Sequence, residues 1–124
     1  MYRKVLVGTD GSATAARAVD RAVEVAAMSG ATLTICTAGR PGKGDDVVAA
    51  DAGRHADSGV EIDTVVVDAD PASALLSTCE EGGYDLLVVG NKGMTGARRY
   101  FTLGSVPNKA VHHLRCSMLI VRTT

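Results

Sequence analysis

Apolar residues along this chain follow two alternating patterns. Short runs such as Leu86 to Val89 are apolar at every position, which is typical of strands buried on both faces of a sheet. Between these runs, apolar residues recur every three to four positions, as on the buried side of an amphipathic helix. The pattern predicts the order β-α-β-α-β-α-β-α-β, with strands at 4–9, 32–37, 61–67, 85–89 and 117–122 and helices at 12–29, 45–57, 71–81 and 105–114.

Residue types at the ends of two segments mark helix boundaries. Gly30 follows the first helix at the position of a C-cap glycine. Asp70 precedes Pro71, and this pair is a strong start signal because a proline in the first turn removes no helical hydrogen bond. Gly82 and Gly83 then end that helix.

The pattern is weakest between residues 39 and 59. Three glycines and a proline within residues 39–44 indicate a loop. Only residues 45–57 have helical spacing, and Gly53 interrupts them. A short helix is therefore predicted there.

Strands that are apolar throughout must be covered on both faces, so we expect a single open parallel five-stranded sheet with helices on both faces, a Rossmann-like α/β fold. The 124 residues suffice for one domain, residues 1–124. In such sheets ligands bind beyond the carboxyl ends of strands, where the strand order reverses. The order 3-2-1-4-5 would bring Gly8-Thr9-Asp10 and Gly90-Asn91 to one cleft.

Glycines cluster after the strand at 85–89. Gly90 and Gly93 lie where the strand ends, and a residue without a Cβ lets the backbone approach a ligand there. Gly104 and Ser105 open the next helix, whose first N–H groups, including that of Val106, attract an anion. Each glycine alone would fit an ordinary turn, and Ser105 an ordinary cap. The combination favours a phosphate cradle built from backbone.

This segment resembles the signature of the universal stress protein family, G-x2-G-x9-G-[ST], in its adenine-nucleotide-binding branch. The stretch VLVGTDGSATAARAVDRAVEVA resembles the family's first strand, acidic turn and first helix. ADPASALL resembles the segment before its third helix, and CSMLIVRTT its final strand. The resemblance covers nearly the whole chain and is weakest at residues 39–59, a region that is longer in the family.

One spacing departs from the family's pattern. Ten residues, Met94 to Leu103, separate Gly93 from Gly104, where the pattern has nine. We expect the extra residue to be absorbed within residues 100–103, because loops accept single insertions at little cost. Gly104, Ser105 and Val106 would then keep their register with Gly90.

The resemblance implies a ligand and a set of contacts. The ligand would be ATP, with or without Mg²⁺. Gly8 and Thr9 would line its pocket, and main-chain groups of Ala38 would contact the adenine. The resemblance also implies the strand order 3-2-1-4-5 and a homodimer paired through the C-terminal strands, for which residues 118–121 supply an apolar edge.

Asp10 is the main acidic candidate for the site. Its carboxylate, at the end of the first strand, could accept hydrogen bonds from ribose hydroxyls or from an adenine amine. Alternatively, Asp10 satisfies its own loop in the turn Asp10-Gly11-Ser12. Opposite the Gly90 loop, the binding role is the favoured interpretation.

The sequence lacks the residues that several other classes of function require. The net charge of −1 gives no general attraction to nucleic acid, and no apolar run is long enough to span a membrane. His112 and His113 are adjacent and point about 100° apart on a helix, so no metal site is expected. The chain contains no Walker-type P-loop, no G-x-G-x-x-G after its first strand and no nucleophile elbow. These absences argue against rapid catalysis.

The three cysteines, Cys36, Cys79 and Cys116, share no close spacing. We expect them to be buried reduced thiols in a cytoplasmic protein.

The sequence as a whole indicates a stress-response sensor or regulator that binds ATP, with at most slow hydrolysis. Three alternatives stay open at this point. The chain could be a dimeric interaction module of the same fold that binds no nucleotide, a binder of cyclic AMP, or an enzyme that cleaves ATP between its α and β phosphates.

Overall fold

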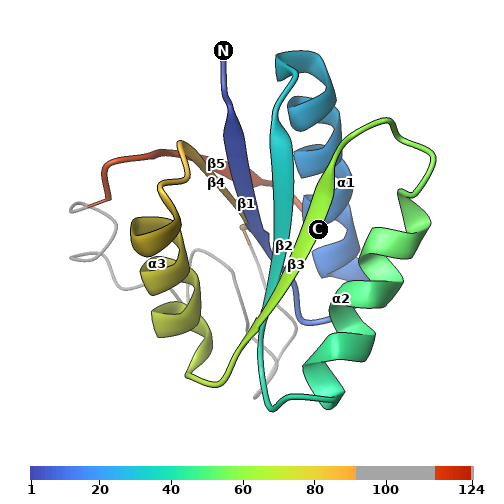
Figure 1. Ribbon diagram of the computed structural model, residues 1–124, viewed down its shortest axis with the longest axis vertical. Coiled ribbons are helices and arrows are strands. Elements are labelled where there is room, and N and C mark those ends of the chain that lie inside the picture. The colour runs from blue at the N-terminus through green and yellow to red at the C-terminus, as the bar shows by residue number, and fades with distance from the viewer. Residues whose placement is uncertain (92–113, 124) are drawn as a thin grey trace.

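The computed structural model describes residues 1–91 and 114–123. Five strands and three helices lie in these residues (Figure 1). The strands are β1 (Lys4–Gly8), β2 (Thr32–Ala38), β3 (Ile62–Val67), β4 (Leu86–Gly90) and β5 (Ser117–Val121), and the helices are α1 (Ala13–Ser29), α2 (Lys43–Arg54) and α3 (Pro71–Gly82). Residues 105–113 of the fourth expected helix lie outside the described residues.

The five strands form one parallel sheet in the order β3-β2-β1-β4-β5, which confirms the predicted α/β fold and strand order. Helices α1 and α2 cover one face of the sheet, and α3 covers the other (Figure 1). Strand β1 is the central strand, with β2 on one side and β4 on the other.

Each face of the sheet has its own apolar core. Under α1 and α2, strand residues such as Val5 and Val7 pack against Val19 and Val48. Under α3, the alternate strand residues Leu6 and Leu87 pack against Leu75. Successive residues of one strand thus enter opposite cores, as the uninterrupted apolar runs predicted.

The expected helix boundaries are present. Ser12 caps α1, where its Oγ accepts a hydrogen bond from the Ala15 N–H at 3.1 Å, and Gly30 ends α1 in the left-handed conformation with φ 67°. Asp70 caps α3 by accepting a hydrogen bond from the Ser73 N–H at 3.1 Å. Hydrogen bonding from the Ser73 side chain, and then from its N–H, lowers the pKa of the Asp70 carboxyl. Pro71 is the first residue of that helix.

Helix α2 begins earlier and ends earlier than the sequence predicted. It runs from Lys43 to Arg54 and passes through Gly53 without a break. Packing on β2 and β3 holds the helix despite its glycines, with Val48 only 2% exposed. Gly44 is buried because the helix starts directly on the sheet: a Cβ added there would lie 2.6 Å from Val66 Cγ1.

The edge strand β5 is covered incompletely. Ser117 and Ile120 are exposed, the latter to 43%, whereas Met118 and Leu119 are partly buried. Within residues 1–91 and 114–123, no helix is both long and apolar enough to cross a membrane.

The two glycines of α2 should respond oppositely to the same substitution. Gly44→Ala would place a Cβ against the side chains of Val66 and Thr37, so we expect a loss of about 1–2 kcal/mol in unfolding free energy. Gly53→Ala meets nothing within 4 Å and should gain about 0.5–1 kcal/mol from helix propensity. Urea unfolding of both variants checks this. Equal gains in both would show that α2 does not start against the sheet as described.

Candidate functional site

The carboxyl ends of β1, β2 and β4 lie side by side. In the ladder, Gly8 is opposite Cys36 of β2, and Val7 is opposite Val88 of β4. The residues that follow β1 therefore leave the sheet between the ends of its two neighbours. This is the neighbourhood that the strand order predicted for Asp10 and Gly90.

A pocket of about 560 Å³ opens between the end of β1, the end of β2 and the start of α2. It brings together two of the predicted site residues, Asp10 and Ala38. The other lining residues, which the sequence did not suggest, are Thr37, Gly39, Arg40, Lys43, Gly44 and Val47. The pocket is thus lined by one acidic residue, by two exposed basic residues, Arg40 and Lys43, and by one apolar side chain of α2, Val47.

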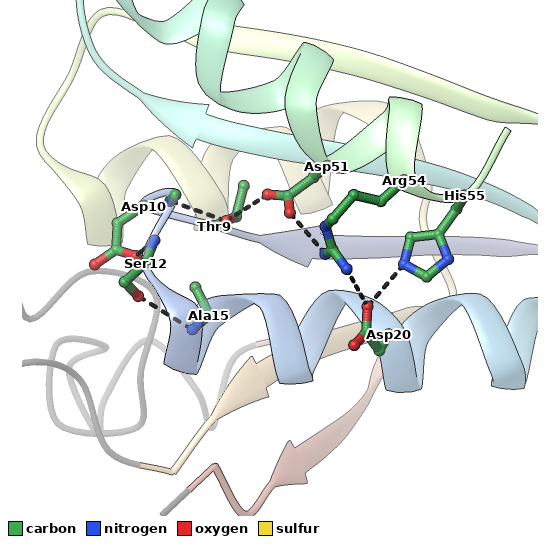
Figure 2. Close-up of polar contacts among 9 residues, drawn as sticks. Thr9, Asp10, Ser12, Ala15, Asp20, Asp51, Arg54 and His55 are labelled. Atoms are coloured by element: carbon green, nitrogen blue, oxygen red, sulfur yellow. Dashed lines mark hydrogen bonds and ion pairs between the residues drawn. The ribbon is translucent and has the colours of Figure 1, made fainter.

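Asp10 closes the turn that was considered for it, and it also lines the pocket. Its Oδ1 accepts a hydrogen bond from the Ser12 N–H at 2.9 Å, which closes the turn into α1 (Figure 2). The residue is also half-buried at the wall of the pocket. Because a carboxylate has two oxygens, the turn uses one and the pocket can use the other.

The backbone of Ala38 points toward the side of the sheet where β1 has ended. Alternate residues of β2 bond to β1, since the Thr32 N–H donates to the Arg3 carbonyl and the Cys36 carbonyl accepts from the Thr9 N–H at 2.9 Å. Ala38 is the next residue in this alternation. Its polar backbone groups therefore face the space that the chain leaves after Thr9, beside Asp10.

Thr9 and Asn91 make contacts within the protein. Thr9 is fully buried, and its Oγ1 donates to Asp51 Oδ2 at 2.9 Å and accepts from the Gly11 N–H at 3.1 Å. The Oδ1 of Asn91 accepts from the Thr123 N–H at 2.8 Å, which ties the end of β4 to the residues after β5. Gly8 and Gly90 are the last residues of β1 and β4, and both are buried.

The second half of the predicted site is not described. Gly93, Gly104, Ser105 and Val106 lie outside residues 1–91 and 114–123, as does the ten-residue spacing between Gly93 and Gly104. Their roles stay predictions from the sequence.

A chain of polar side chains joins the site to α1 and α2 (Figure 2). Asp51 is 6% exposed, and it accepts hydrogen bonds from Thr9 and, through Oδ1, from Arg54 at 2.8 Å. Arg54 also pairs with Asp20 at 2.8 Å, and His55 Nε2 lies 2.7 Å from the same Asp20 oxygen. The network therefore connects the residue before Asp10 to the outer surface of two helices.

These contacts shift two pKa values. Partial burial acts to raise the pKa of Asp20, but the hydrogen bonds from Arg54 and His55 outweigh it and lower that pKa. The hydrogen bonds to Asp51 and Asp20 raise the pKa of Arg54. The arginine is thus held as a cation between two carboxylates.

Comparisons with known proteins agree with this architecture. The model of the universal stress protein family matches residues 1–53 and 42–122. Universal stress protein YxiE of Bacillus subtilis is 30% identical over 149 positions, with 98% of this chain and 100% of that protein covered. The chain belongs to the universal stress protein family.

Other universal stress proteins are similar over their full length. Rv1636 of Mycobacterium tuberculosis is 34% identical over 147 positions, with 99% of this chain and 98% of that protein covered. A solved structure of a universal stress protein in complex with cAMP has a TM-score of 0.81 and 38% identity, with 99% of this chain and 98% of that chain covered.

This universal stress protein is shorter than these relatives. The alignments span 149 and 147 positions, whereas the chain has 124 residues, so they require gaps in this chain. The two matches to the family model overlap at residues 42–53, which lie within or next to α2. The overlap indicates that this chain lacks residues beside α2, the helix that forms one wall of the pocket.

Removal of the buried carboxylate should destabilise the protein. Asp51→Ala leaves the Thr9 hydroxyl without its acceptor and takes one of two partners from Arg54, so we expect a loss of about 2–4 kcal/mol in unfolding free energy. Asp46→Ala, at an exposed position of the same helix, should change it by less than about 0.5 kcal/mol. Urea denaturation measures the unfolding free energy of both variants. If both values equal that of wild type, the hydrogen bonds of Asp51 to Thr9 and Arg54 do not stabilise the fold as described.

The Asp20 pair should add stability only above acidic pH. Because folding lowers the pKa of Asp20, its contribution is present above the unfolded value of 3.8 and is lost as the pH falls through the folded pKa. At pH 6, wild type should therefore be more stable than Asp20→Asn. The difference in unfolding free energy should be less than about 1 kcal/mol, because solvent screens the pair. This difference should disappear below pH 3. Thermal melts between pH 3 and pH 6 test the direction in which this stability difference changes with pH, with Asp57→Asn as an exposed control. A stability difference between wild type and Asp20→Asn that grows as the pH falls would contradict this prediction.

Proposed function

We propose that this universal stress protein binds an adenine nucleotide, with the adenosine part in the pocket between β1, β2 and α2. The observation that carries the proposal is the meeting of Asp10 and Ala38 in one pocket of about 560 Å³ at the carboxyl end of the sheet. Ligands of open parallel sheets bind at this edge, beside the strand where the order reverses. Strand β1 is that strand.

The groups in the pocket match the parts of an adenosine. The backbone of Ala38 can exchange hydrogen bonds with the adenine edge, and the free carboxylate oxygen of Asp10 can accept from ribose hydroxyls. Val47 and the Cβ of Ala38 give an apolar surface for the purine ring. The pocket volume lies within the range of small-molecule sites.

The phosphates would lie toward the end of β4. The sequence signature Gly90, Gly93, Gly104 and Ser105, with the N–H of Val106, supplies backbone donors for them. Gly90 ends β4, the strand next to β1, and Asn91 follows it, so a nucleotide with its base beside Ala38 would extend toward them. The proposed ligand is ATP, with Mg²⁺ as the counter-ion that a triphosphate ordinarily carries.

We propose a regulatory role for the bound nucleotide. The described part of the pocket presents no His or Cys and only one carboxylate, so it offers no acid–base pair for fast hydrolysis. The protein would act in the cytoplasm as a stress-response sensor, and the half-exposed edge of β5 would pair with the same strand of a second copy.

Cyclic AMP is a second candidate ligand. A universal stress protein that is 38% identical to this chain is known in complex with cAMP. The adenosine contacts proposed above are the same for both nucleotides, so the distinction rests on the phosphates. ATP and cAMP titrations of the same sample separate the two candidates.

Asp10→Asn tests the pocket most sharply. The substitution keeps an oxygen for the Ser12 N–H but replaces the other carboxylate oxygen with a donor, so the turn should survive and ATP affinity should fall about tenfold. Asp63→Asn, at an exposed position of β3, should bind as wild type does. Isothermal titration calorimetry with ATP measures both. Unchanged affinity in Asp10→Asn would place the nucleotide elsewhere, and no binding of ATP or cAMP by wild type would favour the interaction-module alternative.

A further inference from the structure

Two of the three cysteines meet although they are 37 residues apart in the sequence. Cys79 lies near the end of α3, Cys116 directly precedes β5, and their Sγ atoms are 3.1 Å apart. The sequence predicted three buried thiols. That prediction is confirmed for Cys36 and Cys79 but is wrong for Cys116, which is partly exposed.

We propose that Cys79 and Cys116 are a redox-modifiable dithiol, which closes to an intramolecular disulfide when the protein meets a small-molecule disulfide such as glutathione disulfide. The proposal does not depend on nucleotide binding.

The geometry requires only a small movement. A disulfide bond is about 2.05 Å long, so the two sulfurs, now 3.1 Å apart, need to approach by about 1 Å. Cys79 is fixed in a helix, but Cys116 lies in irregular chain between Leu114 and β5. The approach can therefore come from the Cys116 side without a change in the sheet.

The two thiols differ in access. Both cysteines line a pocket of about 590 Å³, which Leu76, Tyr84 and Arg115 also line and which gives a small disulfide room to enter. Burial, Cys116 and Glu80 raise the pKa of Cys79 to about 12, so Cys79 is a poor first nucleophile. Cys116 is the more exposed thiol and reacts first.

The chemistry is two thiol–disulfide exchanges. The Cys116 thiol loses its proton and attacks glutathione disulfide, which forms a mixed disulfide on Cys116 and releases one glutathione thiolate that takes up a proton. Cys79 then loses its proton and attacks the Cys116 sulfur, which forms the Cys79–Cys116 bond and expels the second glutathione in the same way. The protein loses two electrons and two protons, and glutathione disulfide gains both as two thiols.

Closure of the bond would connect two elements that flank the nucleotide signature. It would join the end of α3 to the start of β5 and enclose β4 together with residues 92–113, the segment that holds Gly93, Gly104 and Ser105. A cross-link across so long a loop restricts the unfolded chain and stabilises the fold.

Cys36 provides the internal control. It is fully buried on β2, burial raises its pKa to about 11, and it lines neither of the pockets discussed here. Cys36→Ser should leave the oxidation of the other two cysteines unchanged.

The test is mass spectrometry of the full chain after reduction and then incubation with glutathione disulfide. We expect a monomer lighter by two hydrogen atoms, and under non-reducing conditions a tryptic product in which residues 55–92 are joined to residues 116–122. Cys79→Ser should instead accumulate one glutathione on Cys116, and Cys116→Ser should react slowly. The oxidised wild type should also melt several degrees higher than the reduced protein, and Cys79→Ser should show no such shift.

Several results would overturn the proposal. These are a wild type that keeps glutathione on Cys116 without closing the bond, a disulfide that involves Cys36, and a disulfide between two chains. Circular dichroism confirms that each variant folds, and Cys79→Ala replaces Cys79→Ser if the hydroxyl is not tolerated in the core.

Discussion

The position of β1 at the centre of the sheet is the constraint on which the site depends. Its residues Val5 to Val7 are fully buried, and the strand is hydrogen-bonded on both sides. A strand held in this way cannot shift its register without moving apolar residues from one core to the other. The point at which it leaves the sheet, at Thr9, is therefore fixed, and with it the position of Asp10.

The polar network extends that constraint to α2. Asp51 binds the hydroxyl of Thr9, and the same hydroxyl accepts a hydrogen bond from the Gly11 backbone, so one buried carboxylate orients both the end of β1 and the helix that faces it. Gly44 and Val47, from the first two turns of that helix, line the pocket. The wall of the pocket and its acidic residue are thus held by one set of contacts.

The parallel sheet and the helix caps could be predicted because each follows from local patterns and from the rules of parallel sheets. The strand order was predicted from the resemblance to the family, and it places the ends of β1 and β4 side by side. Helix α2 could be predicted only roughly, since its propensity is poor and its packing on β2 and β3 decides its bounds. The contact between Thr9 and Asp51 spans 42 residues and uses side chains that are ordinarily exposed, so no local pattern reports it. No local pattern reports the contact between Cys79 and Cys116 either, because the pairing of β5 with β4 brings these two residues together.

We propose that an adenine nucleotide binds where β1, β2 and α2 meet. Amide chemical-shift mapping by NMR during an ATP titration tests it most directly. We expect the largest shifts at Asp10, Ala38, Gly39 and Val47, with little change at the pocket between α3 and β5 that Leu76 and Tyr84 line. Shifts confined to that second pocket, or no shifts at the first under saturating ATP, would contradict it.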